Sequence, residues 1–287
     1  MPESSADRFV LTLSCTDRMG IVAEASRFLF EQRCNIVDSA QFGDPDNGLF
    51  FMRTSFQSQA PLTAAGLDTE FSPVREKFAM NCAFHVQGAK LPTLVLVSKF
   101  GHCLNDLLYR QRIGALPAQI RAIVSNHPDF ADVAAAAGIA FHHLPVTAGT
   151  KAAQEASLFD IAQKAGVELI VLARYMQILS AEFCAHYSGR IINIHHSFLP
   201  SFKGARPYQQ AHQRGVKLIG ATAHYVTGTL DEGPIIEQAV ERATHGFSVE
   251  DMVAAGRDLE SVVLARAVKW HAEHRILLNG GRTVVFR

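Results

Sequence analysis

The sequence predicts an α/β protein with two domains, and three observations support this. The chain has 287 residues, and because domains commonly contain roughly 100–200 residues, one large or two modest domains are expected. Residues 8–87 read in the order β-α-β-β-α-β, which is the ferredoxin-like arrangement. Beyond residue 92, short apolar runs alternate with helical stretches, which is typical of a doubly wound, mostly parallel sheet.

The first predicted domain covers residues 1–88. Strands are expected where apolar and β-branched residues gather, at 9–15, 35–42, 49–56 and 81–86. Apolar residues at helical spacing predict a helix over 21–32. A second helix is expected over 63–77, broken or offset by Pro73, because proline lacks the amide hydrogen that a helix interior uses.

The second predicted domain covers residues 91–287 and follows a short linker at 88–92. Its strands are expected at 93–98, 119–125, 141–146, 169–173 and 191–195. The helices between them are expected at 103–112, 130–137 and 154–164. Open sheets of this kind bind ligands at the carboxyl ends of their strands, so a site is expected at that edge.

The charge balance excludes several classes of partner. The 27 Lys and Arg residues equal the 27 Asp and Glu residues, whereas nucleic-acid and anionic-membrane binders usually carry a basic surface.

No apolar run approaches the roughly 18 residues of a membrane span, and residues 1–8 do not resemble a signal peptide. Five scattered cysteines without a CxxC motif indicate reduced thiols, so a cytoplasmic protein is expected.

The run 190–200 carries the first candidate catalytic residues. Asn193 and His195 share one face of the predicted strand, because side chains alternate along a strand. From spacing alone, the two could equally be a hydrogen-bonded pair at a strand end. A zinc site shared by His195 and His196 is not expected, because neighbouring strand residues face opposite ways.

The run 220–236 adds an acid. Asp231 lies in a polar loop between two apolar strands, with Gly233 and Pro234 closing the loop. A loop carboxylate is most often simply solvated. His224, on an apolar strand, is more often a packed histidine than a ligand.

Four ordered segments of the second domain resemble the formyltetrahydrofolate-dependent formyltransferase and hydrolase family. They are 193–195, 197–204, 220–224 and 231–236, and the resemblance extends over roughly 91–287. Separately, residues 8–87 resemble an ACT domain, whose strand-to-helix turn matches 17–22. An ACT domain before this catalytic domain is the layout of enzymes that hydrolyse 10-formyltetrahydrofolate to tetrahydrofolate and formate. The implied role is to supply formate and balance the one-carbon folate pool for purine biosynthesis.

The resemblance implies catalytic roles for Asn193, His195 and Asp231. Attack on the formyl carbon creates an oxyanion, which Asn193 and a protonated His195 would stabilise, each donor being worth roughly 10²–10³ in rate. Asp231 would favour the imidazolium form of His195 and orient or deprotonate the attacking water. No metal or other cofactor is implied, since 10-formyltetrahydrofolate is itself the substrate.

The resemblance also implies two binding sites. The folate pocket would be lined by Arg174, Tyr175, Met176, Gln177, Ile178, Leu179, Val226, Thr227 and Gly228. For any one of these residues, ordinary strand-to-helix packing is the alternative. An amino-acid effector such as glycine or methionine would bind the ACT turn at Asp17, Arg18, Met19, Gly20 and Ile21, unless this turn is a plain helix cap. ACT modules commonly pair through their sheets, which implies a homo-oligomer, a dimer or a tetramer.

The alternative reaction is formyl transfer to an amine such as glycinamide ribonucleotide. Family members of that kind carry a glycine-rich loop after the first catalytic strand, where it holds the substrate phosphate. The matching loop, 98–104, has one glycine and the bulky Phe100 and His102, which hinder close approach of the backbone, although Lys99 could still bind a phosphate as a point charge.

Two further alternatives are weaker. Members that formylate initiator tRNA carry an additional domain after the catalytic one, for which the 287 − 231 = 56 residues after Asp231 are too few. A non-catalytic amino-acid sensor would use only the ACT half, and the intact trio of Asn193, His195 and Asp231 disfavours it.

Overall fold

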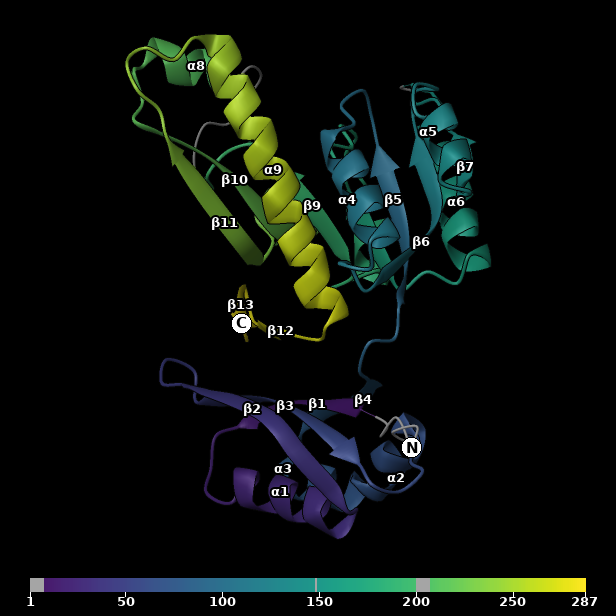
Figure 1. Ribbon diagram of the computed structural model, residues 1–287, viewed down its shortest axis with the longest axis vertical. Helices are drawn as coiled ribbons and strands as arrows, with labels where there is room; N and C mark the ends of the chain where they lie inside the picture. Colours follow the sequence, from purple (N-terminus) through teal and green to yellow (C-terminus); the bar gives the residue numbers. More distant parts are fainter. Residues whose placement is uncertain (1–7, 148, 200–206) are drawn as a thin grey trace. The chain divides into compact units, whose positions relative to one another are not determined.

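The computed structural model describes residues 8–147, 149–199 and 207–287, and it divides into two compact units (Figure 1). The second unit contains Lys90–Ala272 and Gly280–Thr283. The first contains the chain up to Ala89 and two C-terminal segments, Glu273–Asn279 and Val284–Arg287. The sequence pattern assigns these two segments to the second domain.

Side-chain contacts explain why the segment after Ala272 belongs to the first unit. The buried Arg53 donates hydrogen bonds to the backbone carbonyls of Glu273 and His274, both at 3.1 Å. The ring of His274 stacks on that of His85, with centroids 3.5 Å apart. A single arginine fixing a distant backbone leaves no periodic signal in the sequence.

The first unit is a four-stranded antiparallel sheet with helices packed against one face (Figure 1). Its elements are β1 (Arg8–Thr16), α1 (Ile21–Glu31), β2 (Cys34–Asp44), β3 (Leu49–Ser58), α2 (Ala64–Glu70), α3 (Ser72–Phe78) and β4 (Asn81–Val86). The sheet order is β2-β3-β1-β4, and every neighbouring pair is antiparallel. The predicted order of strands and helices is confirmed, and Pro73 lies in the first turn of α3, where the expected second helix is divided.

Alternation along β1 builds the core of this unit. Phe9, Leu11 and Leu13 are buried toward the helices, as the period of two in a strand requires. Aromatic rings close the cluster, with Phe56 packed edge-on against Phe84 at a centroid distance of 6.2 Å.

The second unit is built on a seven-stranded sheet in the order β11-β10-β9-β8-β5-β6-β7. Its strands are β5 (Leu91–Val97), β6 (Ala118–Ser125), β7 (Ala140–His143), β8 (Leu169–Leu172), β9 (Ile191–His195), β10 (Leu218–Tyr225) and β11 (Ile235–Arg242). The pairs from β9 to β7 are parallel, whereas β10 and β11 are antiparallel to their neighbours. The predicted mostly parallel sheet is therefore confirmed.

The helices of this unit connect and cover the sheet. They are α4 (His102–Arg112), α5 (Ala131–Ala136), α6 (Lys151–Lys164), α7 (Ala181–His186), α8 (Pro207–Gln213) and α9 (Val249–Ala272). The short strands β12 (Ile276–Asn279) and β13 (Arg282–Val285) pair near the end of the chain. Within the described part of the chain, no helix combines the length and apolar character needed to cross a bilayer.

Helix α9 is the longest of the described helices and was not predicted. It lies along β9, β10 and β11 and also packs on α4 (Figure 1). Its buried face contains Gly256, Glu260 and several alanines and valines, so a charged residue and small residues interrupt the apolar stripe that would mark it.

We expect Phe56→Ala to lower the free energy of unfolding by about 3–5 kcal/mol, because it leaves a cavity in a closed aromatic core. Phe56 is 0% exposed, whereas Phe30 on α1 is 79% exposed. Phe30→Ala is therefore the matched control and should change the stability by less than about 0.5 kcal/mol. Urea unfolding followed by far-UV circular dichroism compares the two, and equal effects would contradict the core assignment.

Candidate active site

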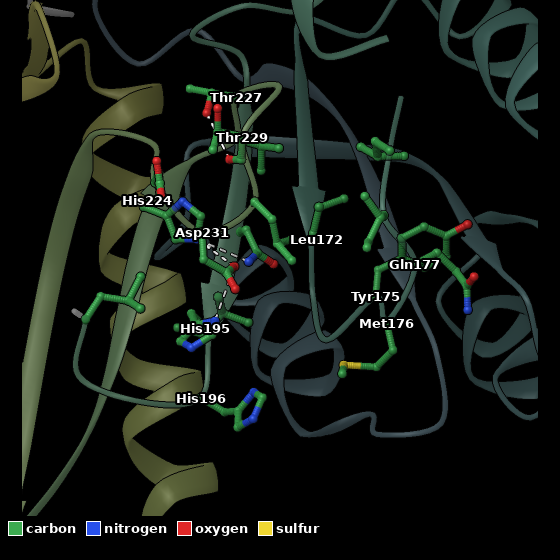
Figure 2. A pocket seen from close by; sticks show the side chains of 18 of the residues that line it. Leu172, Tyr175, Met176, Gln177, His195, His196, His224, Thr227, Thr229 and Asp231 are labelled. Atoms are coloured by element: carbon green, nitrogen blue, oxygen red, sulfur yellow. Dashed lines mark hydrogen bonds and ion pairs between the residues drawn. The ribbon is translucent and has the colours of Figure 1, made fainter. Parts of the chain in front are cut away.

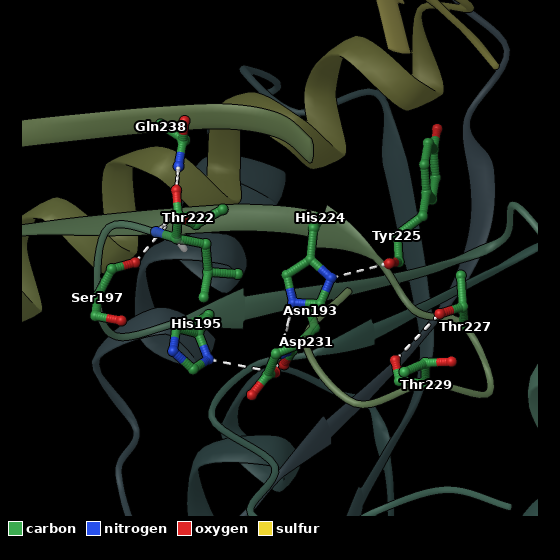
Figure 3. A network of polar contacts seen from close by, with 11 residues as sticks. Asn193, His195, Ser197, Thr222, His224, Tyr225, Thr227, Thr229, Asp231 and Gln238 are labelled. Carbon is green, nitrogen blue, oxygen red and sulfur yellow. Dashed lines mark hydrogen bonds and ion pairs between the residues drawn. The ribbon is translucent and has the colours of Figure 1, made fainter. Parts of the chain in front are cut away.

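The carboxyl end of β9 carries the two predicted polar residues on one face. Asn193 and His195 are both half-buried, while Ile194 between them is buried on the other face. Asp231 reaches them from the loop between β10 and β11, and His195 Nδ1 lies 3.3 Å from Asp231 Oδ1 (Figure 3). The structure thus brings the predicted amide, imidazole and carboxylate together.

The loop that carries Asp231 is held at its base by backbone contacts. The amide of Tyr225 donates to the carbonyl of Pro234 at 2.9 Å, and the amide of Val226 donates to that of Ile191, also at 2.9 Å. Gly233 faces the backbone so closely that an added Cβ would lie 1.7 Å from the carbonyl oxygen of Tyr225. Only glycine fits this position, which fixes where Asp231 stands.

His224 orients the amide of Asn193. Its Nδ1 donates to the carbonyl of Tyr225 at 2.9 Å, which leaves Nε2 as an acceptor for Asn193 Nδ2 at 3.2 Å (Figure 3). Burial lowers the pKa of His224, so the ring is neutral. Its Nε2 lies 3.8 Å from Asp231 Oδ1, but a neutral ring does not form an ion pair with the carboxylate. The packed histidine expected from the sequence therefore also positions a candidate catalytic side chain.

These residues line a cavity of about 560 Å³ (Figure 2), a size typical of small-molecule sites. Its lining contains all the predicted folate-contacting residues, together with Leu172, Ile194, His196, Leu199, His224, Thr229, Leu230 and Glu232. Met176 and Gln177 lie across the cavity from His195 in Figure 2. The hydroxyl of Tyr175 points into the core and accepts a hydrogen bond from Gln154 at 2.8 Å. This side chain therefore stabilises the fold around the cavity.

Burial decides the protonation of His195. Desolvation lowers its pKa, the carboxylate of Asp231 raises it, and the nearby Arg174 guanidinium lowers it further, with a net shift downward. The ring is therefore mostly neutral near pH 7. Asp231 favours the imidazolium form of His195, as expected, but the desolvation of the ring outweighs the carboxylate.

His196 lies beside His195 in the same cavity. The strand ends at His195, so the alternation of faces does not extend to His196, and the two rings stack with centroids 5.1 Å apart at 22°. The expectation that they face opposite ways is therefore wrong. The pKa of His196 is lowered to about 4, first by burial and then by the charge of Arg174.

A second polar cluster, centred on Glu260 of α9, adjoins the cavity. Glu260 is 1% exposed and accepts hydrogen bonds from His102 Nε2 at 2.7 Å and Tyr208 Oη at 3.1 Å. Arg174 Nε lies 3.4 Å from the same carboxylate. Neither Glu260 nor Tyr208 was predicted, because both lie on helices whose sequence gave no functional signal.

The Glu260 cluster includes a possible metal-ligand set. Among the described residues, one atom each of His102, Cys103 and Glu260 lie within 4.8 Å of one another. Burial raises the pKa of the Cys103 thiol, and the carboxylate is already shared between a histidine, a tyrosine and an arginine. These features do not suit a cation, which needs thiolate and free carboxylate oxygens.

The predicted effector residues form the turn between β1 and α1. Gly20 takes a left-handed conformation with φ of 95° and precedes α1 without a side-chain cap, so Asp17 is not a helix cap. Arg18 donates to the carbonyl of Lys77 and lies over the ring of Phe78 at 4.5 Å. Met19 is 98% exposed.

A doubly wound sheet with a cavity at its carboxyl edge is typical of enzymes that bind small molecules, and comparison with known proteins identifies the family. The family model described as formyl transferase matches residues 92–268, so the chain belongs to that family. Of the segments that carry the resemblance, residues 200–204 lie outside the described residues.

The comparisons also define the group within the family. A formyltetrahydrofolate deformylase of Corynebacterium sp. (strain P-1) is 48% identical over 98% of each chain. The crystal structure of a formyltetrahydrofolate deformylase from Burkholderia mallei matches with a TM-score of 0.94 and 53% identity, covering 98% of this chain and 100% of that one. A glycinamide ribonucleotide transformylase from Symbiobacterium toebii matches with a TM-score of 0.65 and 32% identity, covering 71% of this chain and 97% of its own. The chain is a member of the formyltetrahydrofolate deformylase group.

We expect Gly233→Ala to lower the free energy of unfolding by about 1–3 kcal/mol, because its Cβ would collide with the carbonyl of Tyr225. Gly246→Ala is the control, since its Cβ would meet nothing closer than 3.8 Å. Thermal unfolding of the two variants checks this. A Gly233→Ala protein as stable as the control would show that the loop is not held as described.

Proposed function

We propose that this protein hydrolyses 10-formyltetrahydrofolate to tetrahydrofolate and formate. The observation that carries the proposal is the contact of His195 with Asp231, beside the Asn193 amide, in one cavity. The match to deformylases along nearly the whole chain supports hydrolysis over transfer, because the transformylase match covers 71% of the chain. A role in supplying formate for purine biosynthesis is part of this proposal.

The geometry supports a base mechanism for His195. Its Nδ1 hydrogen faces Asp231, so the unprotonated Nε2 takes a proton from water as the water oxygen attacks the formyl carbon. Asn193 gives one amide hydrogen to His224 and keeps the second for the oxyanion. When the carbon–nitrogen bond breaks, His195 returns its proton to the folate nitrogen. The products are tetrahydrofolate and formic acid, which ionises to formate.

The 98–104 loop, where a phosphorylated amine would have to bind, is surrounded by charges of both signs. His102 at the start of α4 is paired with the carboxylate of Glu260, so a buried negative charge stands near that helix terminus. The ring of Phe100 is flanked by Arg174 at 5.7 Å and Arg257 at 5.5 Å. Lys99 is exposed and is the one cationic side chain within residues 98–104 that could bind a phosphate as a point charge.

The reaction is tested by incubating the protein with 10-formyltetrahydrofolate, with and without glycinamide ribonucleotide. Formate released without the amine supports hydrolysis. Turnover that requires the amine would refute hydrolysis and establish transfer.

We expect His195→Ala and Asp231→Asn each to lower kcat by roughly 10²–10⁴, because each removes part of the proton-transfer pair. Folate affinity should stay within about threefold, since apolar walls such as Met176 and Ile178 remain. Single-turnover assays and fluorescence binding measure the two quantities. Near-normal turnover in either variant would defeat the assignment.

The pH profile tests the neutral state of His195. Because its pKa lies below the ordinary 6.5, the base form persists at neutral pH and is lost only as the pH falls through the lowered value. We expect kcat/KM for formate release to be flat near pH 7 and to fall toward acid with a midpoint below 6.5. A midpoint above 6.5 would mean that the imidazolium is the resting form.

The first unit is proposed to be an ACT regulatory domain that binds an amino acid at the turn of Asp17, Arg18, Met19, Gly20 and Ile21. The order of its elements and its antiparallel sheet support this. We also propose that the protein forms a homo-oligomer, either a dimer or a tetramer, and that it is cytoplasmic. Light scattering that gave about the chain mass of 31.4 kDa would refute the oligomer.

We expect glycine or methionine to bind the full-length protein with measurable heat in isothermal titration, and Gly20→Val to abolish it. Valine is strained at the φ of 95° that Gly20 adopts, so the turn would move. Gly48→Val, at φ of 67° in the β2–β3 hairpin, controls for strain elsewhere in the unit. Absence of heat with both amino acids would count against this effector class.

A further inference from the structure

His196 is a cavity-lining histidine that the mechanism above leaves without a role. It lies directly after His195, stacks on that ring, and borders the same cavity (Figure 2). No hydrogen bond or ion pair joins its ring nitrogens to any described residue. An imidazole with free hydrogen-bonding capacity beside the reacting group calls for a partner that enters with the substrate.

The surroundings keep this imidazole neutral. Arg174 stands close enough for its charge to oppose protonation of His196, and Arg174 is itself held by the buried Glu260 at 3.4 Å. Tyr208, which also binds Glu260, lies with its ring 6.5 Å from that of His196. A neutral imidazole offers one N–H donor and one lone pair, so His196 suits a small neutral molecule that both donates and accepts.

The position of His196 beside His195 indicates which small neutral molecule it would bind. Asp231 occupies His195 Nδ1, so His195 works through Nε2. The predicted folate walls come from residues 174–179 and 226–228, and His196 belongs to neither segment. The nucleophile must lie within reach of His195 Nε2, and His196 is the lining residue whose ring stacks on that of His195, with centroids 5.1 Å apart.

We propose that His196 is a positioning residue that holds the attacking water, accepting a hydrogen bond from one water O–H while His195 takes the other proton. This rests on the proposed hydrolysis. As the oxygen–carbon bond forms, one water proton moves to His195 Nε2 and then to the departing folate nitrogen. The proton held by His196 stays on the new formic acid until the acid ionises, so His196 never carries it.

The test uses a competing nucleophile. Hydroxylamine attacks the same formyl carbon through its nitrogen and gives N-hydroxyformamide and tetrahydrofolate, using His195 and Asn193 as water does. The ratio of formate to N-hydroxyformamide does not depend on how much enzyme is folded. A loss of general structure lowers both products together. Hydroxylamine is the stronger nucleophile and depends less on being held in place, so loss of a water-holding group lowers formate more than N-hydroxyformamide.

We expect His196→Phe, which keeps a ring against His195 but offers no nitrogen, to lower the ratio of formate to N-hydroxyformamide by on the order of 10-fold to 100-fold. The KM for 10-formyltetrahydrofolate should change by less than about threefold. His196→Leu should lower the ratio in the same way, and it replaces His196→Phe in the test if the phenylalanine variant does not fold. His196→Asn and His196→Gln restore an acceptor at the two possible positions, and one of them should recover part of the ratio.

The matched control is His245→Phe, at an exposed histidine in the loop after β11, which should keep the wild-type ratio. An unchanged ratio in both His196→Phe and His196→Leu would overturn the inference, whether or not total turnover falls. The wild-type protein without hydroxylamine reports on the function separately. If it releases no formate, the hydrolysis fails and the role of His196 fails with it, whereas formate release with an unchanged ratio removes the role of His196 alone.

Discussion

The contact between His195 and Asp231 is the interaction on which the candidate site depends. It fixes which ring nitrogen of His195 carries the hydrogen and leaves Nε2 unprotonated. The contact exists because β9 and β10 run antiparallel side by side, and the β10–β11 loop, which leaves β10 beside Ile191, brings Asp231 back to His195. Gly233 allows that turn, and the hydrogen bond between Asn193 and His224 adds the amide on the same side. One pair of strands thus assembles groups that are far apart in the sequence.

Desolvation governs how these groups behave. The cavity removes water from His195 and His196, and for both rings burial is the largest influence and lowers the pKa. Asp231 opposes this at His195 without reversing it. The guanidinium of Arg174 lies near enough to lower the pKa of both rings. Its charge is compensated by the buried carboxylate of Glu260. The site is therefore built from neutral imidazoles next to one carboxylate, which suits proton abstraction from water better than stabilisation by a fixed imidazolium.

The strands were predicted well because they depend on local signals, whereas the catalytic trio was inferred from the resemblance to the formyltransferase and hydrolase family. Apolar runs mark β5, β6, β8 and β9, and the alternation of Asn193 and His195 follows directly from a strand at that place. What escaped prediction depends on long-range contacts. The protonation of His195 depends on burial, the stacking of His196 on where β9 ends, and Glu260 on a helix whose apolar pattern is interrupted. The attachment of residues 273–279 to the first unit depends on distant side chains, with Arg53 donating to two carbonyls, His274 stacking on His85, and Asn279 donating to Asp44.

The fold by itself does not choose between water and an amine, since a transformylase shares the doubly wound unit with a TM-score of 0.65. The choice must come from side chains around the open face of the formyl group. Around that face the described residues place a neutral imidazole, His196, backed by the Tyr208, Glu260 and Arg174 contacts. Glu260 is buried and paired with Arg174, so a reactant in the cavity meets the neutral ring of His196, which can accept a hydrogen bond from water. Selection of the nucleophile then depends on which reactant is held beside His195, and the proposed hydrogen bond to His196 holds water there.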